Sequence, residues 1–353
     1  MKVLVYGAGV LGSLYAARLQ DAGNDVSLLA RGPRLADLRA QGIVLQDART
    51  GTETVTRVTV VERLAPDDAY ELVIVLVRKN QIPSVLPDLA ANRNTPNVLF
   101  LGNNAAGAEE YVRALGRERV LLGFASSGGT RQGHVIRYAA GMGGRRPRVT
   151  IGETDGGLSL RLQAIVGLLE GAGFQVDVSP HMDAWLWTHA ALVVPIAGAL
   201  YLAGGDNKRL ARTRDGLVLL VRAAREGFQV LHAGGVPLLP AGALLYEWLP
   251  EPLLVFALGR LMQTELARLA LAAHANVARD EMQQLASELH QLARATGAPT
   301  PALNRLDGYI NPAMAPIPVG RANIPLDWFG VWVSAAVVVG LALFVIRFRP
   351  KAD

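Results

Sequence analysis

Three glycines near the start of the chain have the spacing of a dinucleotide-binding turn. Gly7, Gly9 and Gly12 form a G-x-G-x-x-G directly after the apolar run VLVY, and the helical pattern LGSLYAARLQDAG follows. The first glycine permits a tight turn, the second lets backbone amides approach a pyrophosphate, and the third lets the helix pack closely on the strand. The helix N-terminus then faces the phosphates. The predicted phosphate-binding residues are Gly7, Ala8, Gly9, Val10, Leu11 and Gly12.

A second apolar run, DVSLLAR, ends at Arg31, at the right distance for the second strand of such a unit. An acidic residue at this position would bind the 2′-hydroxyl of NAD, whereas an arginine matches the 2′-phosphate of NADP. Arg31 therefore predicts NADP(H) as the cofactor, with Arg34 as an assisting cation. The alternative is that Arg31 is a solvated loop cation.

One imidazole interrupts a long apolar stretch. Residues 181–205 are almost entirely apolar after Asp183, apart from His189. A histidine titrates close to neutral pH, so His189 is a candidate proton donor. The alternative is a core histidine that is hydrogen-bonded to a backbone carbonyl. The six histidines show no metal-ligand spacing, and we expect no metal site.

The order of apolar runs predicts the elements that position these residues. Strand-like runs at 71–77, 97–101, 119–126, 134–140, 148–153 and 175–178 alternate with helical patterns in the early part, which is typical of a doubly wound sheet. Lys79 and Asn104 follow the first two of these runs, so both are expected at the ligand edge of the sheet. From His181 to about Ala295 the patterns are helical, which predicts a second, all-α domain.

Composition excludes several classes of protein. The 353 residues contain no cysteine, which rules out disulfides, thiolate metal sites and cysteine nucleophiles. The formal charge of +5 comes mostly from arginine, without a basic stripe interleaved with aromatic residues, so we expect no nucleic-acid partner.

The C-terminal part carries a membrane-span pattern. No charge occurs in the 18 residues from Phe329 to Ile346, and Trp328 and Trp332 stand near one end. The alternative is a buried core helix or a strand pair. Because the opening residues lack an export-signal pattern, we expect a single C-terminal anchor with the dinucleotide domain in the cytoplasm. The basic tail alone would favour the reverse orientation.

The chain resembles the ketopantoate reductases (2-dehydropantoate 2-reductases) over roughly residues 1–305. The resemblance lies in GAGVLGS, Arg31, VRKNQ around Lys79, GNNAAGAEE around Asn104, and RDEMQQLASEL around Glu281. It implies an enzyme that reduces a 2-oxo acid with NADPH. It also implies that Lys79 and Asn104 touch cofactor and substrate, that Glu281 holds the substrate, and that the helical domain provides any homodimer contact.

The resemblance fails at the position of the proton donor. Family members carry a general-acid lysine after a tryptophan, followed by asparagines one and two turns later, whereas here Trp187 is followed by His189, Val193 and Ala197. Residues i, i+4 and i+8 share one helical face, so an apolar face replaces the polar lining. Leu269 stands where the family has a serine. Proton donation is then assigned to His189 or to water.

These observations predict a Rossmann-type α/β domain at 1–178, an all-α substrate and dimerisation domain at 179–308, and a Pro-rich linker at 309–327. A transmembrane helix at 328–347 and a basic tail at 348–353 follow. The predicted function is a membrane-tethered, NADP-dependent reductase of ketopantoate or a related carbonyl. The catalytic candidates are His189, Glu281, Lys79 and Asn104. The alternative is an NADP-binding, membrane-tethered sensor or interaction protein that no longer catalyses.

Overall fold

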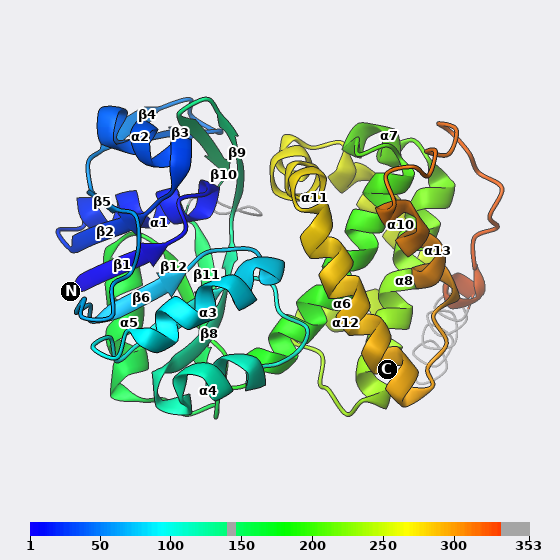
Figure 1. The fold of residues 1–353 in the computed structure, drawn as a ribbon. Coiled ribbons are helices and arrows are strands. Elements are labelled where there is room, and N and C mark those ends of the chain that lie inside the picture. The colour runs from blue at the N-terminus through cyan, green and yellow to red at the C-terminus, as the bar shows by residue number, and fades with distance from the viewer. Residues whose placement is uncertain (140–145, 333–353) are drawn as a thin grey trace, which may run out of the picture.

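The computed structural model describes residues 1–139 and 146–332, which form a sheet-containing body and a helical body side by side (Figure 1). The strands are β1 (Lys2–Tyr6), β2 (Asp25–Leu29), β3 (Ile43–Asp47), β4 (Glu53–Thr56), β5 (Thr59–Val61), β6 (Leu72–Val75), β7 (Val98–Leu101), β8 (Val120–Ser126), β9 (Gly128–Gln132), β10 (Val135–Ala139), β11 (Arg148–Glu153) and β12 (Gln175–Val178). The helices of the sheet-containing body are α1 (Val10–Asp21), α2 (Gly32–Gln41), α3 (Ile82–Ala91), α4 (Glu109–Leu115) and α5 (Leu160–Gly171), with short 3₁₀ turns η1 (Lys79–Gln81) and η2 (Arg117–Arg119).

An eight-stranded sheet is the centre of the first body, with the order β12-β11-β8-β7-β6-β1-β2-β5. The strands from β5 to β8 are parallel, β11 is antiparallel to β8, and β12 is parallel to β11. Alternate residues of β1 enter different cores: Val3 and Val5 pack with α1 and α5, whereas Leu4 and Tyr6 pack with α3 and α4. Both faces of the sheet are therefore buried, which explains why its strands are continuous apolar runs.

A second sheet, with the order β4-β3-β10-β9, was not expected from the sequence. Its edge strand β4 is short and mostly exposed, and β9 has the polar sequence GGTRQ, so both lack the continuous apolar pattern of the parallel strands. Glycines let β9 approach its neighbours. A Cβ on Gly128 would lie 2.6 Å from Ala270 Cα of the helical body, and one on Gly129 would lie 2.9 Å from Val10 Cγ1. Strand β9 therefore packs against η4 of the helical body and against α1 of the sheet-containing body.

The predicted all-α body is confirmed. It contains α6 (Met182–Leu202), α7 (Asn207–Ala211), α8 (Arg214–Ala233), α9 (Leu245–Trp248), α10 (Glu251–Met262), α11 (Ala273–Val277), α12 (Arg279–Thr296) and α13 (Pro301–Asp307), with 3₁₀ turns η3 (Ala241–Leu244) and η5 (Gly308–Ile310) and a π-helical stretch η4 (Ala267–Ala272). Helices α6 and α8 pack together, and α12 and α13 cover them (Figure 1).

The expected linker, residues 309–327, begins within η5 and then packs along the helical body from residue 311. Buried Asp215 accepts a hydrogen bond from Ile324 N at 2.8 Å, and buried Glu251 accepts one from Asp327 N at 2.9 Å. The Arg222 side chain also donates to Pro325 O at 2.8 Å. Buried carboxylates that need donors account for this docking.

The expected transmembrane helix lies almost entirely outside the described residues, which end with a first helical turn at 329–332. Among the described residues, one helix, α6, is long and apolar enough to cross a membrane, and 67% of its most apolar window is buried inside the protein. This burial is typical of a core helix.

Candidate active site

A cleft with a volume of about 1940 Å³ separates the two bodies. One wall is formed by the glycine turn and by the ends of β2, β6, β7 and β8. The other wall is formed by α6, by η4 and α11, and by the start of α12. The carboxyl ends of parallel strands are where such sheets bind ligands, so this cleft is the candidate active site.

The glycine turn has the geometry that its spacing predicts. Gly7 has a φ of 115°, and a Cβ there would lie 2.7 Å from Leu76 O. A Cβ on Gly12 would lie 1.7 Å from Gly7 O, so the close helix–strand packing requires glycine. Gly9 is different, because no atom lies within 4 Å of its Cβ position. The turn therefore leaves space at Gly9 for a ligand on the N-terminus of α1, as a pyrophosphate needs.

Arg31 lies at the cleft, and its side chain is 59% exposed. Its guanidinium is 3.1 Å from the Tyr6 hydroxyl and 3.2 Å from Asp88 Oδ2. Burial and the hydrogen bond to Asp88 raise the pKa of Tyr6 to about 12, so the phenol stays neutral. A phosphate bound to Arg31 would compete with the Asp88 carboxylate.

Arg34 lies behind the glycine turn and is largely buried. Its Nε donates to Ala8 O at 3.3 Å and its Nη2 donates to Ser13 Oγ at 3.1 Å. Its buried Nη1 has no hydrogen-bond partner among the described residues. Burial, with a smaller effect of Arg131, lowers the pKa of Arg34. A positive charge without a carboxylate partner beside the turn fits an anionic group there.

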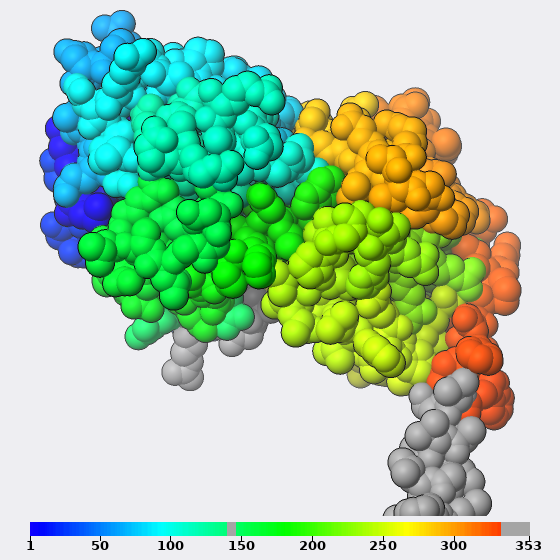
Figure 2. Space-filling model, turned by 90° about the horizontal axis from the view of Figure 1, so that it is seen from below, coloured from blue at the N-terminus to red at the C-terminus, as the bar shows by residue number. Residues whose placement is uncertain are grey.

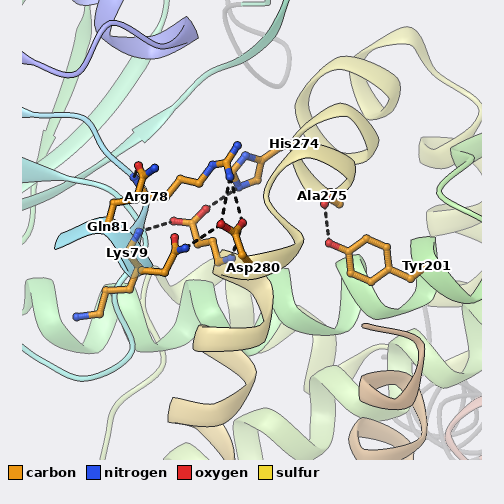
Figure 3. A network of polar contacts seen from close by, with 9 residues as sticks. Arg78, Lys79, Gln81, Tyr201, His274, Ala275 and Asp280 are labelled. Carbon is orange, nitrogen blue, oxygen red and sulfur yellow. Dashed lines mark hydrogen bonds and ion pairs between the residues drawn. The ribbon is translucent and has the colours of Figure 1, made fainter. Parts of the chain in front are cut away.

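Lys79 is not at the cleft, which corrects the expectation from the sequence. Its side chain is 4% exposed, and its Nζ lies 3.3 Å from the Tyr111 hydroxyl and 3.5 Å from Glu110 Oε2. Figure 3 shows the ammonium directed away from the cluster at the cleft. The 3₁₀ turn after β6 sends adjacent side chains in different directions, and Arg78 lines the cleft instead.

Asn104 is also turned away from the cleft. Its Nδ2 donates to Gly107 O at 2.7 Å and its Oδ1 accepts from Ala106 N at 3.0 Å, so the side chain stabilises its own loop. The preceding residue, Asn103, lines the cleft, and its buried Oδ1 has no hydrogen-bond partner among the described residues. The sequence shows two adjacent asparagines after β7, but the apolar pattern of the strand does not indicate which of them faces the ligand edge of the sheet.

His189 lies at the cleft in a cluster with two aromatic rings, which also contact each other. Its ring centroid is 4.0 Å from that of Phe124 and 5.5 Å from that of Trp185. Burial, with a smaller contribution from His274, lowers the pKa of His189 to about 4. The imidazole is therefore neutral at neutral pH.

The predicted apolar face of α6 is only partly at the cleft. Val193 lines it, whereas Ala197 is buried in the core of the helical body, because Pro195 and the neighbouring helices cover that end of α6. Leu269 is buried in η4 rather than lining the cleft. The apolar lining of the helical wall comprises Val193, Leu239, Pro240, Leu266, Ala270 and Leu271.

Glu281 is the centre of a polar cluster on the opposite wall, which also contains His274 and Asp280. The side chain is almost fully buried, and its Oε1 accepts from Lys79 N at 3.0 Å. Its Oε2 lies 3.4 Å from Nε2 of His274 and makes no hydrogen bond to the described residues. Lys79 thus contacts Glu281 through its backbone and not through its ammonium.

Asp280 joins the two walls. Its carboxylate accepts from Arg78 Nη1 at 3.1 Å and from Asn80 Nδ2 at 2.8 Å. These contacts connect the turn after β6 to the start of α12, so they fix Glu281 relative to the sheet. Sequence reasoning identified Glu281 but missed His274, Arg78 and Asn103. No spacing rule connects His274 to residues that the fold brings together.

Comparison with known proteins agrees with this arrangement. A family model described as ketopantoate reductase PanE/ApbA matches residues 3–156. The 2-dehydropantoate 2-reductase of Halobacterium salinarum is 31% identical over 242 residues, which are 67% of this chain and 77% of that protein. A PanE/ApbA family ketopantoate reductase structure from Ralstonia eutropha has a TM-score of 0.72 at 21% identity, covering 88% of this chain and 97% of that one. D-mandelate dehydrogenase, solved with NADH and anilino(oxo)acetate, also has a TM-score of 0.72, at 16% identity, and covers 88% of this chain and 98% of its own.

The family comparison shows an oxidoreductase that acts on a keto group and binds NAD(P)H. The chain belongs to the ketopantoate reductase family.

Proposed function

We propose that this chain reduces a 2-oxo acid to the 2-hydroxy acid with NADPH in the cleft between its two bodies. One observation carries the proposal: the glycine turn with Arg31 and the buried carboxylate Glu281 lie on opposite walls of the same cleft. A dinucleotide on the first wall would meet a substrate on the second.

Each wall has a distinct role in this proposal. The amides of residues 7–12 hold the pyrophosphate, with Arg34 behind them, and Arg31 binds the 2′-phosphate. When bound, the cofactor supplies the hydride. On the other wall Glu281 orients the substrate, and Arg78, from the turn after β6, attracts the substrate carboxylate across the cleft. Lys79 positions Glu281 through its backbone amide, and Asn104 keeps Asn103 at the cleft.

The apolar wall favours a substrate with an apolar side chain. Val193 occupies a position where family members carry an asparagine, and the lining residues around it are apolar. A hydroxyl placed against this wall would lose its hydrogen bonds to water without gaining new ones, which costs about 1–3 kcal/mol. The catalytically lapsed alternative loses support because the cleft keeps a carboxylate with an adjacent imidazole.

We also propose that the chain is tethered to a membrane by residues 328–347. Trp328, Phe329 and Trp332 are exposed where the described residues end, and tryptophan favours the membrane interface. A Cβ on Gly330 would lie 3.4 Å from Pro250, which stands between α9 and α10. The exposed Trp248 of α9 and Phe256 of α10 therefore belong to the part of the helical body that is adjacent to this end of the chain. Figure 2 shows the red end of the described chain beside this part of the helical body.

The cytoplasmic location of the cleft stays a prediction, which protease protection of intact cells tests. A homodimer through the helical body is also still a prediction, and the mass of the detergent-solubilised chain tests it.

The experiment that tests the main proposal is NADPH oxidation by the full-length chain in detergent. The substrate panel pairs 2-oxo acids of similar size whose side chains are apolar or hydroxylated, and it includes ketopantoate. We expect turnover with 2-oxo acids and higher kcat/KM for the apolar member of each pair. Binding of NADPH without oxidation in the presence of any member would contradict the proposal and favour the lapsed sensor.

A further inference from the structure

The proposed reaction needs a proton for the carbonyl oxygen, and this inference rests on that proposed function. His189 occupies the position of the family lysine, but its ring is parallel to that of Trp185 and packs at an angle against that of Phe124. Its pKa of about 4 leaves the ring neutral at neutral pH, and it forms no ion pair with a described carboxylate that would favour the protonated form. The donor must be sought elsewhere in the cleft.

His274 has the surroundings that His189 lacks. It lines the same cleft, its side chain is 40% exposed, and its Nε2 lies 3.4 Å from Glu281 Oε2. That carboxylate oxygen is buried and has no other partner among the described residues. A buried carboxylate beside an imidazole favours the protonated ring and fixes its orientation.

The backbone around His274 is held in place by contacts on both sides. Tyr201 donates to Ala275 O at 2.6 Å, and Asn276 Nδ2 donates to Gly205 O at 2.9 Å. Figure 3 shows Tyr201 and Ala275 on the side of His274 away from the sheet. The π-helical stretch η4 leads directly into α11, and such stretches are frequent at functional sites.

We propose that His274 is the proton donor of the reaction and that Glu281 positions it. Hydride adds to the carbonyl carbon, the electron pair of the C=O π bond moves to the oxygen, and the oxygen takes the proton. An N–H bond of the imidazolium breaks and an O–H bond forms, while Nε2 stays beside Glu281. The exposed part of the ring lets the neutral imidazole regain a proton from water.

The charges around His274 define the pH range. Burial lowers the pKa of His274 below 6.5, Glu281 from α12 opposes this shift, and Arg78 from the turn after β6 adds to it. Asp280 pairs with Arg78, and His189 faces from α6. Because the acid form is the donor, reduction should slow as pH rises through the pKa of His274.

The test compares His274→Gln with His232→Gln in the full-length chain. His232 forms a similar pair with Glu247 at 2.9 Å but lies outside the cleft. We expect His274→Gln to lower kcat about 10²–10⁴-fold, since general acid catalysis contributes this much, with NADPH affinity unchanged. The His232→Gln variant should keep the parent rate.

Two readouts distinguish a donor from a structural residue. Loss of His274 should flatten the fall in rate with rising pH, and added imidazole should restore part of the rate. Glu281→Gln should shift the decrease in reduction rate to lower pH. His189→Gln should leave the pH range of this decrease unchanged.

A parent-like rate and pH profile in His274→Gln would overturn this inference alone. Absence of any 2-oxo acid reduction by the parent chain would overturn the proposed function as well. If His274→Gln loses NADPH binding together with activity, and imidazole restores nothing, the residue is structural and the inference is wrong.

Discussion

The two histidines at the cleft illustrate how surroundings decide the chemistry of one residue type. His189 is buried among aromatic rings, and this burial disfavours its charge, whereas His274 lies against a buried carboxylate. Titratable groups in contrasting surroundings are typical of acid–base sites. The sequence shows both imidazoles, but not their surroundings: Phe124 in β8 is distant from His189 in the chain, and the turn between α11 and α12 decides that Glu281 lies beside His274.

The surroundings of His189 predict a pH dependence of stability. Its folded-state pKa of about 4 lies below the usual 6.5, so the unfolded chain binds a proton more readily between these values. The free energy of unfolding should therefore fall as pH decreases from about 6.5 to about 4, by about 1.4 kcal/mol per unit of pKa difference. Urea unfolding across this range should show a smaller fall for His189→Phe than for the parent. An equal fall in both proteins would contradict the low pKa.

Arg31 gives a second prediction at this scale. Arg31→Ala should weaken NADPH binding about 10- to 100-fold, which corresponds to a charge-assisted hydrogen bond of about 1.5–3 kcal/mol, and should leave NADH binding nearly unchanged. Titration calorimetry measures both affinities. Arg39→Ala is the matched control, because Arg39 pairs with Glu62 outside the cleft. Equal NADPH and NADH affinities in the parent would contradict the role of Arg31.

The sequence could not predict which of two adjacent side chains points into the cleft. The ends of β6 and β7 were predicted to reach the ligand edge, and Leu76 and Gly102 do line the cleft. A difference of one position then places Arg78 and Asn103 there instead of Lys79 and Asn104. The turn after each strand decides this direction, and its hydrogen bonds involve residues that no apolar pattern identifies.

At the scale of elements, the glycine turn was predictable because its geometry is local. The strand β1, the turn and α1 are contiguous, and Gly7 and Gly12 each meet a constraint within this unit or from Leu76, directly after the adjacent strand β6. The second sheet was not predictable in the same way. Its strands β3 and β10 pair across about 90 residues of sequence, and their partners β4 and β9 lack an apolar pattern.

Two substitutions separate folding from cofactor binding in this element. Gly12→Ala should destabilise the protein by at least about 1–3 kcal/mol, because its Cβ would overlap Gly7 O, whereas Gly9→Ala should leave the unfolding midpoint unchanged. Gly9→Ala should nevertheless weaken NADPH binding, because its methyl group would occupy the space left for the pyrophosphate. Thermal unfolding and calorimetry measure the two effects. Unchanged NADPH affinity in Gly9→Ala would place the phosphates elsewhere.

At the scale of the molecule, the docked residues 311–327 fix the route of the chain. They connect α13 to the exposed aromatic end near α10, so a membrane anchor would hold the helical body directly against the bilayer. The sequence predicted two domains because their hydrophobic patterns differ. It could not show that the Pro-rich stretch packs on α8, because the docking depends on buried Asp215 and Glu251.

The absence of cysteine makes this arrangement testable with single labels. Phe256→Cys places an environment-sensitive dye near the proposed membrane surface, and Leu160→Cys, on the 83% exposed residue at the start of α5, is the control. In vesicles, lipid-borne quenchers should quench the label at 256 but not the label at 160. Equal quenching at both positions would contradict the membrane contact. Failure of the full chain to float with vesicles would contradict the tether itself.

The central claim is that NADPH in this cleft delivers a hydride to the carbon of a 2-oxo acid. The most direct measurement is a single turnover with NADPH deuterated at the transferable position, followed by mass spectrometry of the product. The structure predicts a 2-hydroxy acid that carries one deuterium at C2. Recovery of the unchanged 2-oxo acid from a chain saturated with NADPH, or a hydroxy acid without deuterium, would contradict the account.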